Sequence, residues 1–135
     1  RRQRQMCIRD SHYLTFEKDG KALQHKGHKL SLTNACNDHD GKDMRFVLWW
    51  QGKNPKDNAF YISTADKHDR KYIASSLELT TKEKAAQFSI ADLGNGKGHV
   101  ITEIDSGKQL SVEKDGCVAL TKNASDAFKV FSVTF

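Results

Sequence analysis

The hydrophobic and polar positions of this chain alternate in short runs, and no long segment repeats apolar residues at helical spacing. β-Branched and aromatic residues fill the runs, whereas Gly, Asp, Asn and Lys separate them. Turn sequences such as Lys18-Asp19-Gly20 and Ser106-Gly107 supply residues that tolerate a positive φ. The pattern therefore predicts an all-β fold of twelve short strands. The predicted strands span residues 12–17, 21–25, 28–33, 44–50, 59–64, 71–75, 77–81, 87–91, 98–104, 108–113, 117–122 and 128–135.

Two short patterns recur along the chain, which indicates internal repeats. One carries an aliphatic anchor at Leu30, Ile73 and Leu110, with spacings of 43 and 37 residues. The other carries a phenylalanine with spacings of 42 and 40 residues, at Phe46, Phe88 and Phe128. Three pseudo-repeats of about forty residues, with four strands each, predict a threefold all-β barrel capped by hairpins. Two registers stay open for the first unit, because its first strand is either the one at 12–17 or one that precedes the sequence.

The combination of Gly-x-x-Leu-Ser on the second strand of a unit and Phe-x-hydrophobic on the fourth resembles the β-trefoil superfamily, in particular its fascin-like and ricin-B-like modules. The resemblance covers residues 12–135 and implies a single β-trefoil domain whose core holds the six anchors. Period-2 alternation assigns an inner face independently at pairs such as Phe60/Ile62 and Val118/Leu120. The Gln-x-Trp motif of ricin-like sugar-binding units is absent, which moves the resemblance toward fascin-like repeats.

Residues 1–11 form a segment with a different character. They resemble the translation of a transposase adaptor used to prepare sequencing libraries, and the match runs from Arg1 to Asp10 and into the codon of Ser11. The resemblance implies that this segment is a disordered artefact to be excluded from the fold, and that the natural N-terminus is missing. The domain at 12–135 is then interpreted as a module that can follow other domains in a longer protein. The alternative is a genuine basic arm.

The charge of the chain changes when this segment is set aside. The full sequence of 135 residues has a net charge of +5, from 22 basic and 17 acidic residues. Residues 1–11 contribute four arginines and one aspartate, so the remainder carries +2 and keeps only Arg45 and Arg70 beside sixteen lysines. Because arginine is the side chain best suited to phosphate, we expect no nucleic-acid partner. No apolar run is long enough to cross a bilayer, so we expect no membrane partner either.

The most conspicuous local feature is the pair Trp49-Trp50. Neighbouring side chains on a strand point to opposite faces, so we expect one ring in the core and the other exposed. An exposed tryptophan beside Gln51 offers a stacking platform for a sugar or a partner side chain. The alternative is that the second ring covers the end of the barrel or packs against a missing domain.

A polar loop precedes this pair and contains Asn37, Asp38 and Asp40. Ricin-like trefoils hold sugars through an aspartate, an asparagine and an aromatic residue in each unit, so the resemblance makes this loop a candidate for the same role. A solvated turn is the alternative interpretation. The candidate ligand-binding set is Asn37, Asp38, Asp40, Trp49, Trp50 and Gln51.

Other constellations carry less information. The sequence His25-x2-His28-x7-Cys36-x2-His39 contains zinc-ligand residue types but matches no known finger spacing, so we expect no metal site. We find no phosphate loop and no nucleophile with its base, so we expect no cofactor and no enzymatic activity. Cys36 and Cys117 are either bridged or reduced, depending on the redox compartment.

The sequence therefore predicts a non-catalytic binding module, monomeric or part of a larger chain, with a glycan or protein ligand. Our first hypothesis is carbohydrate binding, with the module appended to a secreted enzyme. The second hypothesis is a cytosolic fascin-like interaction module whose lysine-rich loops meet an acidic partner.

Overall fold

The computed structural model describes residues 13–26, 29–34, 44–54, 56–66, 68–114, 116–122 and 126–133. The adaptor-like segment 1–11, the loop residues Asn37, Asp38 and Asp40, and Cys36 lie outside these ranges. The predictions made for them are therefore not tested by the structure.

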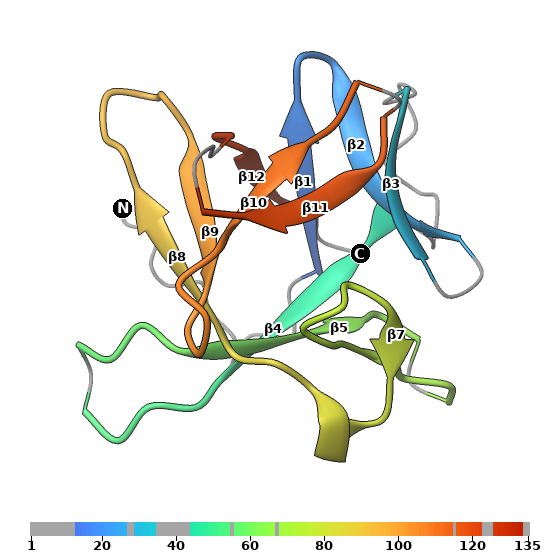
Figure 1. Ribbon diagram of the computed structural model, residues 1–135, viewed down its shortest axis with the longest axis vertical. Coiled ribbons are helices and arrows are strands. Elements are labelled where there is room, and N and C mark those ends of the chain that lie inside the picture. Colours follow the sequence, from blue (N-terminus) through green and yellow to red (C-terminus); the bar gives the residue numbers. More distant parts are fainter. Residues whose placement is uncertain are drawn as a thin grey trace.

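The described chain forms twelve strands joined in one antiparallel sheet, which confirms the all-β prediction (Figure 1). Each predicted strand is present, and its ends differ by at most two residues from the predicted ones. A 3₁₀ turn at Lys82–Lys84 joins β7 to β8. The strands are β1 (Tyr13–Lys18), β2 (Lys21–Lys26), β3 (Lys29–Asn34), β4 (Phe46–Trp50), β5 (Phe60–Thr64), β6 (Tyr72–Ile73), β7 (Leu79–Thr80), β8 (Phe88–Asp92), β9 (His99–Glu103), β10 (Gln109–Val112), β11 (Val118–Thr121) and β12 (Lys129–Val133).

Six of the strands form a closed circuit of pairings. Following the pairs leads from β1 to β4, β5, β8 and β9 in turn, and β12 returns to β1. The gap between β9 and β12 is closed by a bridge between His99 and Phe128. In this bridge the backbone N–H of His99 donates to the carbonyl oxygen of Phe128 at 2.7 Å, and the N–H of Phe128 donates to that of His99 at 2.8 Å.

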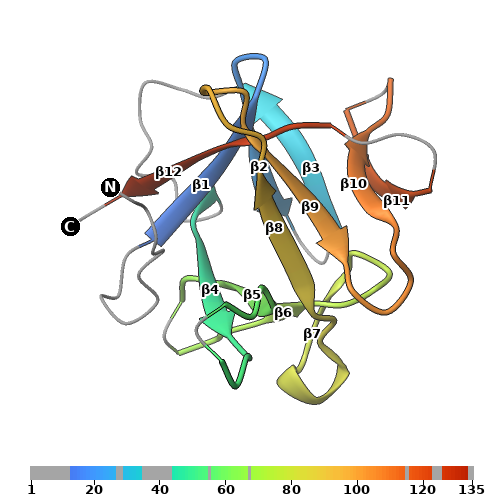
Figure 2. The same ribbon diagram turned by 90° about the vertical axis from the view of Figure 1, so that its left-hand side faces the viewer.

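The other six strands form three hairpins, β2–β3, β6–β7 and β10–β11. Two of these hairpins touch, because the N–H of Leu32 on β3 donates to the carbonyl oxygen of Gly116 in the β10–β11 turn at 3.0 Å. Both views place the β6–β7 hairpin at the end of the molecule opposite the β1–β2 turn (Figures 1 and 2).

The core lies inside the circuit and beneath the hairpins. The rings of Phe16 and Phe46 meet at 5.6 Å between centroids, and the ring of His25 meets that of Phe46 edge-on at 5.3 Å. Burial of this apolar surface is the main stabilising contribution, at roughly 25 cal/mol per Å². All six predicted anchors are buried, namely Leu30, Ile73, Leu110, Phe46, Phe88 and Phe128.

The predicted equivalence of the three aliphatic anchors is wrong for Leu30. Ile73 and Leu110 lie on β6 and β10, the first strands of their hairpins, whereas Leu30 lies on β3, the second strand of its hairpin. Leu23 on β2 is the buried residue on the corresponding strand. Both Leu23 and Leu30 face the core, so hydrophobicity alone does not distinguish them.

Candidate functional site

The structure brings together three of the six predicted site residues, at the end of β4. Trp49 and Trp50 close that strand, and Gln51 opens the loop that leads to β5. The two tryptophans pair with neighbouring residues of β5, Trp49 with Tyr61 and Trp50 with Phe60. Their side chains therefore leave the strand on opposite faces, as predicted. Neither ring belongs to the hydrophobic core, however, so the expectation that one of them is a core residue is wrong.

Trp49 is half-buried on the outer face of β4. Its indole Nε1–H donates to the hydroxyl oxygen of the buried Ser63 at 2.7 Å. The guanidinium of Arg70 lies over the ring, 4.7 Å from its centroid, in a cation–π contact. Arg70 therefore covers one face of the Trp49 ring.

Trp50 is the more accessible of the two, with 39% of its surface exposed. Its indole Nε1–H donates to the carbonyl oxygen of Asp57 at 3.0 Å. The ring also lies close against Gly52, where a Cβ atom would come within 2.7 Å of the indole nitrogen. The exposed ring is thus held in place from two sides by its own loop.

The carboxylate of Asp57 organises this loop. Its Oδ2 accepts hydrogen bonds from the backbone N–H groups of Lys53 at 2.8 Å and Asn54 at 3.0 Å. These backbone donors, that of Asn54 first, lower the pKa of Asp57 below its ordinary value. Asp57 also donates its own N–H to the carbonyl oxygen of Asn54 at 2.9 Å. One residue therefore fixes both the loop backbone and the orientation of Trp50.

A second residue ties the loop to the neighbouring strand. The side-chain amide of Asn58 donates to the carbonyl oxygen of Ile90 at 2.8 Å and accepts from the N–H of Ile90 at 2.9 Å. The amide therefore pairs with β8 as a strand backbone would. Gln51 and Asn54 of the same loop are exposed, and the side-chain amide of Gln51 donates to the carbonyl oxygen of Trp49 at 3.2 Å. A fixed aromatic ring in a loop with exposed amide groups is an arrangement that can stack on a sugar and bond its hydroxyls.

The sequence did not single out a cavity of about 570 Å³ between the β6–β7 turn, the β9–β10 turn and β11. Glu103 lines it and is only 5% exposed. Its Oε1 accepts a hydrogen bond from the hydroxyl of Ser106 at 2.6 Å. A glutamate at an inward-facing strand position is the signal that could have identified it, since buried carboxylates are rare.

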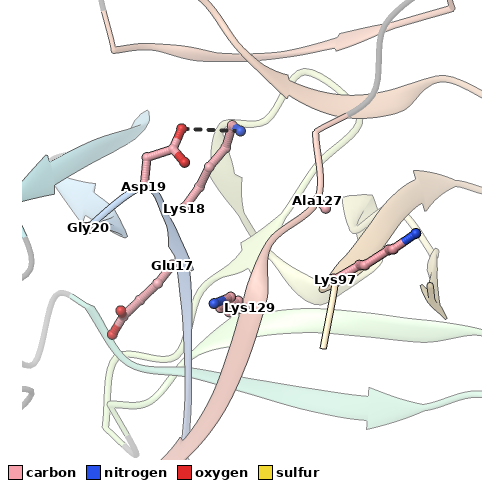
Figure 3. A pocket seen from close by; sticks show the side chains of 7 residues that line it. All are labelled: Glu17, Lys18, Asp19, Gly20, Lys97, Ala127 and Lys129. Atoms are coloured by element: carbon pink, nitrogen blue, oxygen red, sulfur yellow. Dashed lines mark ion pairs between the residues drawn. The ribbon is translucent and has the colours of Figure 1, made fainter. Parts of the chain in front are cut away.

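A second cavity, of about 460 Å³, is lined by Lys18, Lys97 and Lys129 together with Glu17 and Asp19 (Figure 3). The ammonium of Lys18 lies 3.4 Å from a carboxylate oxygen of Asp19. The side chain of Lys97 points away from this pair. The positive charge of this cavity is therefore partly compensated within the chain.

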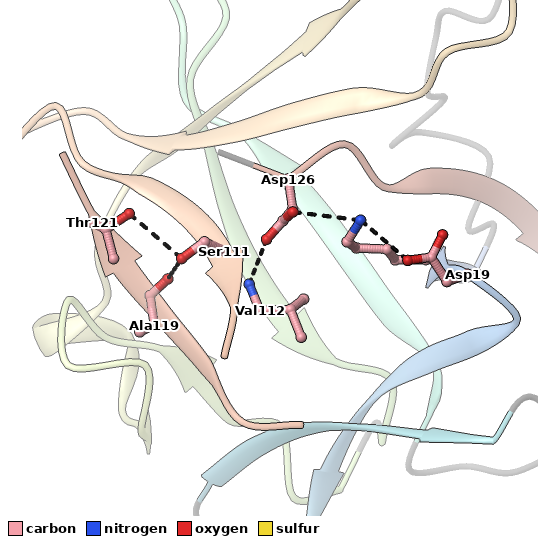
Figure 4. Close-up of polar contacts among 7 residues, drawn as sticks. Asp19, Ser111, Val112, Ala119, Thr121 and Asp126 are labelled. Atoms are coloured by element: carbon pink, nitrogen blue, oxygen red, sulfur yellow. Dashed lines mark hydrogen bonds and ion pairs between the residues drawn. The ribbon is translucent and has the colours of Figure 1, made fainter. Parts of the chain in front are cut away.

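Asp126 is the second carboxylate that compensates the positive charge of Lys18 (Figure 4). Its Oδ1 lies 3.4 Å from the ammonium of Lys18, and its Oδ2 accepts the N–H of Val112 at 2.6 Å. Burial by itself lowers the pKa of Lys18, but the charges of Asp126 and Asp19 outweigh that effect and raise it. We interpret this cluster as a structural connection between β1, β10 and the segment before β12.

The described residues include no group of three or more His, Cys, Asp or Glu that could hold a metal ion. Of the four residues considered for zinc, only His25 is described, and its ring packs on Phe46. Cys117 is exposed, and its pairing with Cys36 is not tested. Within the same described ranges, no helix is long and apolar enough to span a membrane.

Comparison with models of known protein families and with curated proteins finds no match for this chain.

Proposed function

We propose that this chain is a β-trefoil module that binds carbohydrate and has no catalytic activity. Support for the trefoil comes from the pairing of the first and fourth strands within each predicted unit. The pairs are Leu14 with Phe46, Phe60 with Phe88 and His99 with Phe128. Each pair contains one repeated phenylalanine, and each unit carries its hairpin between these two strands.

The carbohydrate proposal is based on the ring of Trp50, which is exposed and is held in place by its own loop. An aromatic ring that is fixed before binding loses little conformational entropy when a ligand stacks on it. The hydrogen bond to Asp57 occupies the polar edge of the indole, and the exposed part of the ring remains for the C–H groups of a sugar. Gln51 and Asn54 supply both donors and acceptors for the sugar hydroxyls.

A glycan array with the folded protein tests this proposal, using the variants Trp50→Ala and Leu93→Ala. Leu93 is an exposed apolar residue in the β8–β9 turn and serves as the matched control. We expect binding by the natural sequence and by Leu93→Ala, and about tenfold weaker binding by Trp50→Ala, equivalent to about 1.4 kcal/mol. An array without signal, or equal binding by Trp50→Ala, would contradict the proposal.

A second candidate function is a fascin-like protein-interaction module, and the position of Arg70 favours it. The guanidinium stacks on Trp49, and among the described residues Arg70 forms no ion pair. An oriented guanidinium of this kind can bind a carboxylate of an acidic partner by donating hydrogen bonds to it. A pulldown with an acidic peptide distinguishes the two functions: protein docking through Arg70 requires that binding weaken as salt increases and be lost in Arg70→Gln.

A further inference from the structure

The Glu103 cavity contains a carboxylate that the hydroxyl of Ser106 bonds at one oxygen, and no described residue bonds the other oxygen. Glu103 lies at the end of β9 and is 5% exposed. Its Oε1 accepts the hydroxyl of Ser106, and no described residue donates a hydrogen bond to Oε2. None of the ion pairs formed by the described residues includes Glu103. A ligand that brings a cation to Oε2 gains a hydrogen bond between ionised groups, which is stronger than one between neutral groups.

The cavity around this carboxylate suits a small ring-shaped ligand. Its volume of about 570 Å³ lies within the range of about 300–1,000 Å³ that small-molecule sites occupy. The hydroxyl-bearing residues Ser75, Ser76 and Ser106 line it, and Val118 and Leu120 supply apolar surface. The lining therefore combines bonds for ligand hydroxyls with an apolar surface for ligand C–H groups.

The backbone of the β6–β7 turn is strained where it contributes to this cavity. Leu77 has a φ of +67°, an unfavourable conformation for a branched side chain. The turn is held by hydrogen bonds from Leu77 N–H to the carbonyl oxygen of Ala74 and from Ala74 N–H to that of Glu78. This conformation buries the side chain of Leu77 in the core while Ser75 and Ser76 stay exposed at the cavity.

The charge of the cavity favours a cationic ligand. Glu103 and Asp105 contribute two carboxylates, and Lys108 contributes one ammonium. Among the described residues Lys108 forms no ion pair, so Glu103 has no bound cation from this side chain. The buried position of Glu103 makes it the acceptor for the ligand charge, because hydrogen bonds between ionised groups are the stronger ones.

We propose that this cavity binds the ammonium group of an amino sugar, with Glu103 as its acceptor and the serine hydroxyls on the sugar ring. This inference rests on the proposed carbohydrate-binding function and adds a second site, apart from the Trp50 loop, whose ligand is a glycan that carries unacetylated amines. A lysine side chain of a partner protein carries the same charge, but its narrow stem leaves the serine hydroxyls without ligand partners.

Calorimetric titration with two tetrasaccharides tests the proposal. One is the β-1,4-linked glucosamine tetramer, at a pH that keeps its amines protonated, and the other is its fully N-acetylated counterpart. We expect the natural sequence to bind the amine form at least about tenfold more tightly, the effect of one charged hydrogen bond. Glu103→Gln keeps the shape and the bond to Ser106, and we expect it to lose that preference. Glu113→Gln removes an exposed carboxylate that does not line the cavity and should behave as the natural sequence does.

The outcomes separate this inference from the broader proposal. Trp50-dependent binding on the glycan array without preference for the amine tetramer would overturn the assignment of Glu103 and leave carbohydrate binding standing. Absence of binding to every glycan would overturn both. Binding of a lysine oligomer in place of the glucosamine tetramer would overturn the glycan assignment. Equal thermal melting of Glu103→Gln and the natural sequence shows that a lost preference does not arise from unfolding.

Discussion

The indole nitrogen of Trp50 donates its hydrogen to the backbone carbonyl oxygen of Asp57 at 3.0 Å, across a loop of six intervening residues. The same aspartate binds two loop N–H groups through its carboxylate. The orientation of the exposed ring is therefore coupled to the loop backbone rather than to the core. Changes in the loop should reach the ring without unfolding the protein.

Gly52→Ala should displace Trp50. A Cβ at this position would lie 2.4 Å from that of Asp57 and 2.7 Å from the indole nitrogen, so the loop must open. We expect weaker glycan binding, a changed tryptophan fluorescence spectrum and a loss of about 1–3 kcal/mol in the free energy of unfolding. Gly20→Ala is the control, because its φ is +80° but no atom lies within 4 Å of the added methyl group. It should lower stability and leave the fluorescence unchanged; equal spectra for both variants would contradict the steric coupling.

Acid should release the loop only below the ordinary pKa of an aspartate. The folded pKa of Asp57 is lowered from 3.8 by the N–H groups of Asn54 and Lys53. Its contribution is therefore complete above pH 3.8 and is lost as the pH falls through the folded pKa. Fluorescence of a Trp49→Phe variant, in which Trp50 is the only tryptophan, should report this transition. Asp57→Asn does not titrate, so a persistent transition in that background would assign the effect to another group.

Phe128→Ala should be among the most damaging core substitutions. Its side chain is fully buried, and its backbone closes the strand circuit with His99. Removing the ring leaves a cavity and should cost about 3–5 kcal/mol of unfolding free energy, measured by urea denaturation. Val130→Ala, at a half-buried position on β12, the strand that follows Phe128, should cost less. A loss at Phe128 no larger than the loss at Val130 would be inconsistent with the central position assigned to Phe128.

Two substitutions at Asp126 should separate its hydrogen bond from its charge. Asp126→Ala removes the acceptor of the Val112 N–H and should cost about 1–3 kcal/mol. Asp126→Asn keeps an oxygen acceptor and loses only the attraction to Lys18, which is partly exposed to solvent, so we expect about 0–1 kcal/mol.

The pH dependence of the Asp126→Asn effect provides a further check. The pKa of Lys18 is raised above 10.5, so the ion-pair contribution is present below that value and disappears as the pH rises through the folded pKa. The stability difference between Asp126→Asn and the natural sequence should vanish there. A difference that persists in strong alkali would assign it to the hydrogen bond instead.

The fold class and the strands could be predicted from the sequence because alternation at a period of two is a local property. The buried phenylalanines were also predictable, since Phe46, Phe88 and Phe128 each begin a Phe-x-hydrophobic pattern at nearly constant spacing. The choice between Leu23 and Leu30 required the pairing of strands, because both are buried leucines on neighbouring strands. The alternation of hydrophobic and polar residues indicates which face of the sheet a side chain occupies, but it does not indicate which strand is its neighbour.

The candidate site was less predictable than the fold. The opposite directions of Trp49 and Trp50 followed from strand geometry, but the cover of Trp49 by Arg70 depends on a contact across 21 residues. Glu103 lies in a cavity formed by three segments between residues 75 and 120, which only the tertiary structure brings together. The polar loop with Asn37, Asp38 and Asp40 lies outside the described residues, so its predicted role stays a prediction.

The pairing of β1 with β12 has a consequence for synthesis of the protein. Tyr13 pairs with Val133, so β1 finds this partner only after the more than one hundred residues between them have left the ribosome. Until then that edge of β1 is an open template for other chains, and closure requires a contact between distant ends, which is slow. The steps at risk of aggregation therefore fall in the interval between the emergence of β1 and the arrival of β12.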